Sequence, residues 1–158
     1  MYTRKEQLMI KALNQAKLAY KKGETPVGAI IVRDGQIISR GHNLKETKKD
    51  VTSHAEIEAI RRAARKLGTW RLDGCEMYVT LEPCPMCAGA IIQSRISTLY
   101  IGAMDNRAGA AGSAIDLFRI GQFNHRVDVV IGLLFEECGE LLKDFFRNAR
   151  RDADKGYK

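Results

Sequence analysis

One histidine, one glutamate and two cysteines carry the most visible chemistry in the sequence. His54 and Glu56 lie two residues apart, and the cysteines Cys84 and Cys87 follow in the segment Pro83-Cys84-Pro85-Met86-Cys87. A histidine and two thiolates are the three ligands of a catalytic zinc ion that leaves its fourth position to water. Glu56 then remains free to transfer protons. The pattern predicts a zinc site of His54, Cys84 and Cys87, with Glu56 as its acid–base group.

The spacing of the two cysteines suits the binding of a single ion. Side chains three residues apart project from the same face of a helix, so Cys84 and Cys87 can reach one metal if a helix begins there. The positive end of the helix dipole favours thiolates, and it keeps His54 neutral at the start of its own helix. Zinc held by these groups lowers the pKa of water toward about 7. The expected chemistry is hydroxide attack on an aromatic ring and release of an amine, with proton transfer by Glu56.

These residues also have plainer interpretations. Ser53 and Glu56 have the spacing of a capping box, in which Glu56 would only bind a backbone N–H. A lone C-x-x-C pair is also typical of redox sites or of half a structural zinc site, but the chain has no second pair of this kind. The full set therefore favours catalytic zinc. His42 and His125 lie outside the pattern, and we expect them to be structural or surface residues.

The composition is that of an ordinary soluble domain. We expect residues 1–158 to form one domain, with a basic, flexible tail from about residue 152. No stretch approaches the roughly 20 apolar residues of a membrane span, so we expect a cytoplasmic protein without membrane association. In that compartment cysteines stay reduced, and Cys75 and Cys138 should be buried thiols. The net charge of +7 fits either a polyanionic partner or a solvated basic surface.

Hydrophobic periodicity predicts the elements that position these residues. A helix over 3–22 begins with Thr3 and Glu6 in capping-box spacing, and Asp34-Gly35 joins two strands at the edge of a sheet. A second helix carries His54 and Glu56 in its first turn and ends near Gly68. The remaining predicted elements are strands at 27–33, 36–41, 77–81, 99–102 and 127–131, a polar loop at 42–52, a buried helix at 85–94 and a helix at 135–151. Strands alternating with helices predict an α/β layered fold.

From about Glu6 to Ala153 the chain resembles the cytidine deaminase-like superfamily, and within it the bacterial tRNA-specific adenosine deaminases. The zinc pattern alone would also fit cytidine, deoxycytidylate, guanine or riboflavin-pathway deaminases. Further segments indicate the tRNA branch, among them Pro26-Val27-Gly28-Ala29, Gly41-His42-Asn43-Leu44, Trp70-Arg71-Leu72, Tyr78-Val79-Thr80-Leu81-Glu82 and Gly109-Ala110-Ala111-Gly112-Ser113.

The resemblance implies a three-layer α/β fold with a central five-stranded mixed sheet flanked by helices. It implies a homodimer with one Zn²⁺ per subunit, which converts adenosine to inosine at the wobble position of a tRNA anticodon stem-loop, usually in an arginine tRNA. The implied roles are zinc binding by His54, Cys84 and Cys87, proton transfer by Glu56, and hydrogen bonding of Asn43 to the flipped base. The base pocket would be lined by Val27, Ala55, Leu81, Glu82 and Pro83, and flanking nucleotides would contact Asp105, Phe145 and Arg150.

Two departures from the family pattern affect neither the ligands nor Glu56. Pro85 stands where an aliphatic residue such as valine is common, and residues 104–108 are a variable version of a substrate-side loop. Two other functions stay open. A deaminase of free guanine, cytosine or a nucleoside would not need a basic surface. A zinc-stabilised RNA-binding module without activity would keep the metal ligands but would not need Glu56.

Overall fold

The computed structural model describes residues 1–156, and its central layer is a five-stranded sheet. The strand order is β2-β1-β3-β4-β5. Strands β2, β1 and β3 pair antiparallel, whereas β3, β4 and β5 pair parallel. The strands are β1 (Gly28–Arg33), β2 (Gln36–His42), β3 (Cys75–Leu81), β4 (Thr98–Ala103) and β5 (Asp128–Ile131). The predicted five-stranded mixed sheet is confirmed.

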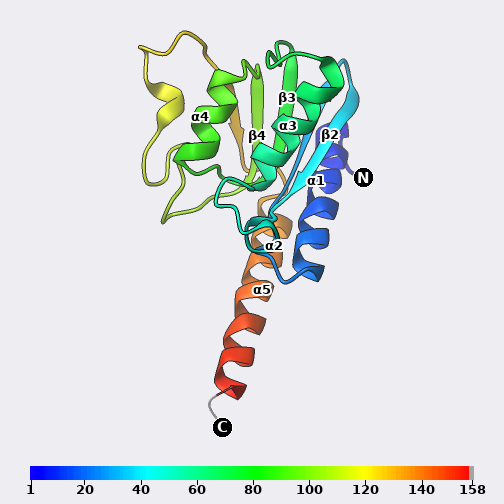
Figure 1. The fold of residues 1–158 in the computed structure, drawn as a ribbon, viewed down its shortest axis with the longest axis vertical. Helices are drawn as coiled ribbons and strands as arrows, with labels where there is room; N and C mark the ends of the chain where they lie inside the picture. The colour runs from blue at the N-terminus through cyan, green and yellow to red at the C-terminus, as the bar shows by residue number, and fades with distance from the viewer. Residues whose placement is uncertain (157–158) are drawn as a thin grey trace.

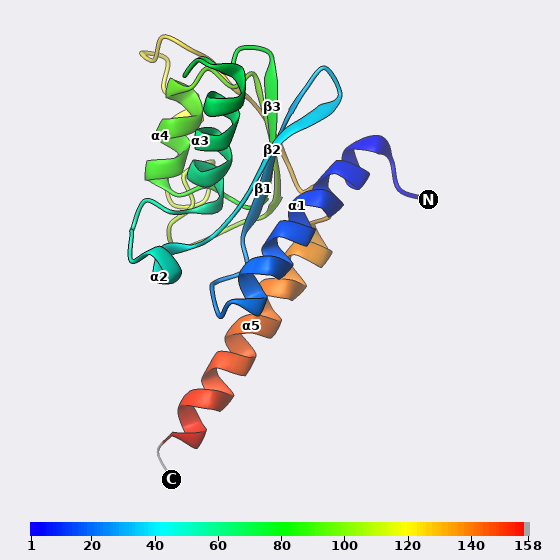
Figure 2. The same ribbon diagram turned by 45° about the vertical axis from the view of Figure 1, so that its right-hand side comes forward.

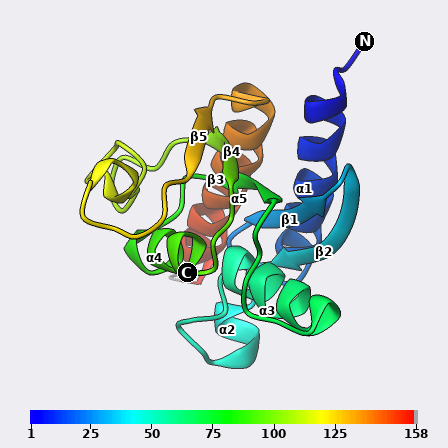
Figure 3. The same ribbon diagram turned by 90° about the horizontal axis from the view of Figure 1, so that it is seen from above.

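Helices cover both faces of this sheet. Figures 1 and 2 show α1 (Arg4–Lys21) and α5 (Phe135–Lys155) on one face, and α3 (Ala55–Leu67) and α4 (Pro85–Gln93) on the other. The view from above in Figure 3 shows the same three layers. Two short helices, α2 (Lys45–Lys48) and the 3-10 helix η1 (Leu117–Arg119), lie in connecting segments. The arrangement is the predicted three-layer α/β fold.

The sheet has a hydrophobic core on each face because successive strand residues point to opposite sides. In β1, Ala29 and Ile31 pack with α3 and α4, whereas Ile30 and Val32 pack with α1 and α5. In β3, Met77 and Val79 lie on the first of these faces and Tyr78 on the second, and in β4 Leu99 and Ile101 lie opposite Tyr100. Both faces of the central strands are therefore buried, as their nearly continuous apolar sequence requires.

Local signals in the sequence correctly predicted several element ends. Thr3 and Glu6 form the capping box at the start of α1. Asp34 and Gly35 form the tight turn between β1 and β2 with φ values of 50° and 76°, which the Asp-Gly pair favours. Gly68 ends α3 in the left-handed conformation. Each of these ends depends on interactions within a few residues.

A glycine in β2 allows the start of α3 to pack closely on the sheet. A Cβ atom on Gly41 would overlap the backbone oxygen of Ala55 and the nitrogen of Ala59. Any side chain at Gly41 would therefore push the first turn of α3 away from the sheet. This contact positions His54 and Glu56, which lie at that end of the helix.

Three expectations about the helices require correction. The polar loop predicted at 42–52 contains α2, which ends where Lys49 adopts a φ of 51°. The last helix, predicted to end at residue 151, continues to Lys155, because no helix breaker lies between Asp152 and Lys155. The flexibility of the basic tail stays a prediction. Residues 157–158, including Lys158, lie outside the described residues.

The third correction concerns α4. Its apolar sequence predicted burial on all sides, but Cys87, Ala88, Ile91 and Ile92 are its buried residues, whereas Pro85 and Gln93 are exposed. The covered face meets the sheet, α3 and η1. Within residues 1–156, no helix combines the length and the apolarity needed to cross a membrane.

Candidate active site

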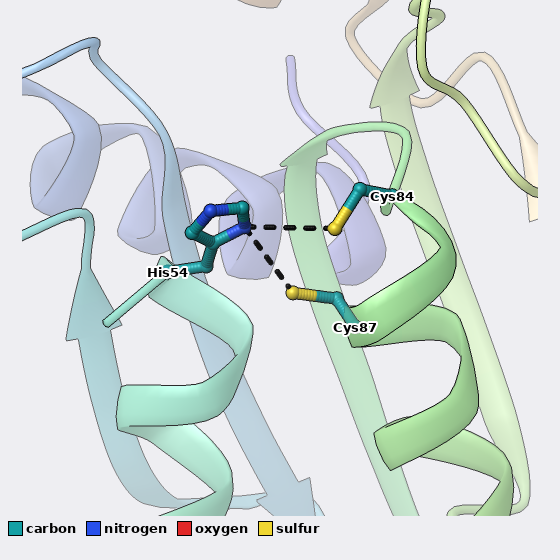
Figure 4. A group of neighbouring side chains, drawn as sticks. All are labelled: His54, Cys84 and Cys87. Carbon is teal, nitrogen blue, oxygen red and sulfur yellow. Dashed lines mark hydrogen bonds between the residues drawn. The ribbon is translucent and has the colours of Figure 1, made fainter. Parts of the chain in front are cut away.

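Two helix N-termini bring the sequence-predicted metal ligands together. His54 is the N-cap residue of α3, and Cys84 is the N-cap residue of α4. Cys87 lies in the first turn of α4, so both sulfurs project toward the histidine (Figure 4). The three ligands thus come from the chain segments that enter two neighbouring helices on the same face of the sheet.

The distances among the ligand atoms fit a tetrahedral metal ion. His54 Nδ1 lies 3.6 Å from Cys84 Sγ and 3.5 Å from Cys87 Sγ. All three ligand atoms lie within 4.8 Å of one another. Zinc–nitrogen and zinc–sulfur bonds of usual length, meeting at a tetrahedral angle, place nitrogen and sulfur about 3.6 Å apart. The cluster therefore has the donor types and the separations of a metal site, with Nδ1 as the histidine ligand atom.

The protein also prepares a thiolate in this cluster. The hydrogen bond with Cys87, together with the smaller effect of His54, outweighs burial and lowers the pKa of Cys84 to about 4. The same hydrogen bond and burial raise the pKa of Cys87 above its ordinary value, so the two sulfurs share one proton. The hydrogen bond with Cys84 raises the pKa of His54. A cation among these groups would be bound by thiolates, as zinc coordination requires.

Glu56 lies beside the ligands and is only 3% exposed. Burial raises its pKa to about 7, against the lowering effects of its own backbone N–H and of His54. The N-cap of α3 is His54, without a side-chain cap bond, so Ser53 and Glu56 do not form the alternative capping box. A carboxyl group with a pKa near 7 can accept and donate a proton at neutral pH.

A cavity of about 220 Å³ opens above the ligands. Nine of its lining residues are sequence-predicted site residues: Val27, Asn43, His54, Ala55, Glu56, Leu81, Glu82, Cys84 and Asp105. Its walls come from the segments before β1, after β2 and after β4, from the C-terminal end of β3 and from the N-terminal end of α3. A metal-ligand cluster and a buried acid–base group therefore border the same cavity.

Comparison with known proteins identifies the family. A family model described as MafB19-like deaminase matches residues 3–150. The tRNA-specific adenosine deaminase of Bacillus subtilis is 48% identical over 149 residues, which cover 94% of this chain and 92% of that protein. This chain belongs to the tRNA-specific adenosine deaminase family. A relative of the same name from Aquifex aeolicus is 47% identical over 148 residues, covering 94% of this chain and 97% of its own length.

Solved structures support the same assignment. A structure from a study of A-to-I editing by tRNA:A34 deaminases superposes with a TM-score of 0.84 at 45% identity, covering 86% of this chain and 99% of that chain. A guanine deaminase from Bacillus subtilis has a TM-score of 0.62 at 36% identity, covering 78% of this chain and 82% of that chain. The fold is thus shared by deaminases of different names, whereas the higher identity lies with the tRNA-specific adenosine deaminase family.

Asn43 is held rigidly at the rim of the cavity. Its amide nitrogen donates to the Thr25 backbone oxygen at 3.2 Å, and its amide oxygen accepts from the Lys45 backbone nitrogen at 3.1 Å. One N–H and one lone pair of this amide are not used by these two bonds. Asn43 therefore lines the cavity with its side chain tied to the segments on either side of it.

Four sequence-predicted residues do not line the cavity. Cys87 and Pro83 are buried behind it. Phe145 packs edge-on against Tyr20 of α1, with ring centres 5.4 Å apart, and it lines a separate groove on α5. Arg150 is exposed in the second half of α5, which extends beyond the end of the sheet at which α3 begins (Figure 1).

Sequence reasoning missed three residues that line the cavity, namely Thr25, Lys45 and Ala108. Thr25 and Lys45 each lie two residues from a predicted site residue, and Ala108 lies in the same loop as Asp105. This proximity is the only sequence signal that could have found them. The expectations for other side chains are confirmed. Cys75 and Cys138 are buried, His42 binds Lys22 and Gln15, and His125 donates to the Ile96 carbonyl at 2.6 Å.

Proposed function

We propose that the protein hydrolyses adenosine to inosine at the wobble position of a tRNA anticodon. The observation that carries the proposal is the position of Glu56 beside the His54, Cys84 and Cys87 cluster, in a chain 48% identical to a tRNA-specific adenosine deaminase over 94% of its length. Inosine formation at this position is also the activity named for the best-superposed of the solved structures described above.

The donor set suits Zn²⁺, with one ion per subunit held by His54, Cys84 and Cys87. Two thiolates and one imidazole are preferred zinc ligands, and their separations match tetrahedral coordination. When bound, zinc supplies Lewis-acid activation of water. The backbone N–H groups at the start of α4 favour the thiolate charges, so the fold itself supports the ligand set.

The protein groups move the protons and hold the base. Deamination replaces the exocyclic amine of adenine by oxygen from water and releases ammonia. Glu56 accepts one proton from the water and transfers it to a ring nitrogen, and it then takes the remaining proton of the added hydroxyl and delivers it to the amine, which leaves as ammonia while the C=O bond forms. Asn43 hydrogen-bonds the base, while Val27, Ala55 and Leu81 provide apolar walls. The partly enclosed cavity requires a base taken out of its stack, which costs least in a loop.

The partner is a tRNA anticodon stem-loop, with arginine tRNA as our candidate from the family resemblance. Asp105 lines the cavity, which supports our proposal that it contacts a neighbouring nucleotide. Phe145 and Arg150 lie on α5, so they would meet nucleotides farther from the base. We also propose that residues 1–158 form one domain, and that the protein works as a cytoplasmic homodimer.

Salt dependence tests the role of α5. Arg147, Arg150, Arg151 and Lys155 are exposed on its second half. Each phosphate contact contributes about 0.7 to the slope of log affinity against log salt for single strands. Replacing Arg150 and Arg151 by glutamine should flatten the slope, whereas the same change at the exposed Arg65 and Lys66, at the far end of α3, should not. If the slope is the same in both variants, Arg150 and Arg151 do not contact phosphates, and the end of α5 is only a solvated basic surface.

A free-base deaminase is the second candidate, favoured by the TM-score of 0.62 with a guanine deaminase. The test measures zinc content and then ammonia release from four substrates: an anticodon stem-loop, the same sequence in a duplex, free adenosine and guanine. We expect the stem-loop to have the highest kcat/KM, the duplex to react weakly and free adenosine to react hardly at all, because flanking contacts help to hold the ring. Equal values for nucleoside and stem-loop, or faster reaction of guanine, would favour the second candidate.

A further inference from the structure

Glu82 is a buried residue whose carboxylate is fully occupied by another part of the chain. It is 2% exposed. One carboxylate oxygen accepts from the Asp105 backbone N–H at 2.9 Å and from the Ser113 hydroxyl. The other accepts from the backbone N–H groups of Ala111 at 2.9 Å and Ser113 at 3.1 Å. These four bonds use the four acceptor sites of a carboxylate, so none remains for a substrate.

The bonds join two segments that border the same cavity. Glu82 lies two residues before the metal-ligand candidate Cys84, in the turn that leads from β3 into α4. Asp105 and Ala108 belong to the other segment and line the cavity wall. Two backbone bonds run beside the carboxylate, from Glu82 N to Ala103 O and from Ala110 N to Pro83 O, each 2.8 Å long. Residues 105–113 are therefore fastened onto the turn that carries Cys84.

The packing around Glu82 shows that the carboxylate position is specified closely. A Cβ atom added to Gly109 would overlap the Glu82 carboxyl carbon and both of its oxygens. Gly109 has an ordinary backbone conformation, so steric contact with Glu82 is what excludes a side chain there. The loop thus has both the hydrogen-bond donors and the space that this one carboxylate needs.

We infer that Glu82 is a positioning residue, which sets the cavity wall formed by residues 105–109 against the metal-ligand turn without touching the base. The inference deepens the proposed function, on which it rests, because the held wall is the one that a nucleotide next to the reacting base would meet. Glu82 therefore acts on substrate binding, whereas Glu56 acts on the reaction itself.

The first test is Glu82→Gln in the zinc-loaded full-length protein. An amide cannot accept all four bonds, and its NH₂ group opposes backbone N–H donors. We expect KM for the anticodon stem-loop to rise about tenfold, as the loss of charge-assisted bonds implies, with kcat nearly unchanged and zinc stoichiometric. Ser113→Ala removes one donor and should raise KM less, which keeps the test informative if Glu82→Gln folds poorly.

Glu58→Gln is the matched control. Glu58 is also buried, at 3% exposed, but it pairs with Lys48 at 2.9 Å and does not line the cavity. Glu58→Gln should therefore leave KM for the stem-loop unchanged. A loss of zinc from Glu82→Gln, a fall in kcat at constant KM, or an unchanged KM in both Glu82→Gln and Ser113→Ala would each overturn the positioning role.

A double-mutant cycle with Gly109 tests the contact itself. Gly109→Ala should raise KM in the wild-type background, because its Cβ displaces the loop from Glu82. In a Glu82→Ala background the overlapping atoms are gone, so Gly109→Ala should add no further increase. Additive effects would contradict the proposed contact.

Hydrogen exchange separates this inference from the proposed function, because it needs no substrate. Glu82→Gln should speed exchange of the amides of Asp105, Ala111 and Ser113, and should leave the amides of β1 and β3 unchanged. Failure of the wild-type protein to deaminate the stem-loop would refute the proposed function alone. Unchanged exchange at these three amides would refute the fastening by Glu82.

Discussion

Glu56 and Glu82 are buried glutamates that border the same cavity, yet their surroundings have opposite effects on the two carboxyl groups. Burial is the largest influence on Glu56 and raises its pKa to about 7. Burial also acts on Glu82, but hydrogen bonds from Ser113, Asp105 and Ala111 outweigh it and hold the pKa below its ordinary value. Burial alone therefore does not predict what a carboxyl group does. The number of donors around it separates a group that can exchange a proton from one that holds a loop.

The largest expected effect comes from Glu56→Gln. The amide cannot accept the proton that water must lose, so turnover should fall by at least about 10² to 10⁴. Because no ligand is removed, zinc content and Tm should stay at or above the wild-type values. Metal analysis, thermal unfolding and ammonia release check these outcomes. Near-normal turnover in a zinc-loaded variant would remove the distinction between the two glutamates.

Cys87→Ser should act on the metal rather than on proton transfer. An alcohol is a poor zinc ligand. Loss of an outer-shell partner of a metal site lowers metal affinity roughly 10- to 100-fold, and we expect loss of a direct ligand to lower it more. We expect zinc loss and a lower Tm, because the ligands come from the starts of α3 and α4. Cys75→Ser makes the same chemical change in the core and should keep its zinc. Stoichiometric zinc in Cys87→Ser would exclude Cys87 as a ligand.

A smaller effect is expected at Glu24, which, like Glu82, is buried and accepts hydrogen bonds from backbone N–H groups. Glu24 is 1% exposed and accepts from the backbone N–H groups of Glu46 at 3.0 Å and Thr47 at 2.8 Å, next to Lys45 of the cavity wall. Burial pushes its pKa up, but the bonds from Thr47 and Glu46 outweigh burial and lower it. Glu24→Gln should cost about 1–3 kcal/mol of unfolding free energy at pH 7.

The sign of this pH dependence follows from the lowered pKa. The unfolded chain binds the proton more tightly than the folded protein, so the stabilisation by Glu24 is complete above the unfolded pKa of about 4.3. It is lost as the pH falls through the folded pKa. Denaturant unfolding between neutral and acid pH should therefore show a flatter acid limb for Glu24→Gln than for the exposed control Glu136→Gln. Parallel curves would show that the ionised form of Glu24 does not stabilise the fold.

The features that could be predicted from the sequence are mostly those that depend on neighbouring residues. His54 lies 30 residues before Cys84 and was assigned to the same site from the residue pattern of a catalytic zinc ion. Cys84 and Cys87 were predicted as a pair because their spacing at the start of a helix is local. The capping box at Thr3 and the Asp34-Gly35 turn were predictable for the same reason. The spacing of Ser53 and Glu56 also matched a capping box, but the N-cap of α3 is His54 and not Ser53, so this local pattern predicted the wrong cap.

Contacts between distant segments could not be predicted in this way. Glu82 meets donors 23 to 31 residues away, and no local pattern indicates that its carboxylate is directed at them. Phe145 packs against Tyr20, 125 positions earlier in the chain, because α1 and α5 share one face of the sheet, and no local pattern indicates this contact. The sequence thus predicts the reacting groups better than the groups that position them.

A single-turnover measurement at saturating stem-loop concentration tests the different roles of Glu56 and Glu82 most directly. Inosine formation is followed with zinc-loaded wild-type protein, Glu56→Gln and Glu82→Gln, so that differences in binding no longer limit the rate. We expect Glu82→Gln to react at nearly the wild-type rate and Glu56→Gln to react at least about 10²-fold more slowly. Equal losses in the two variants, or a larger loss in Glu82→Gln, would contradict the assignment of proton transfer to Glu56 and of positioning to Glu82.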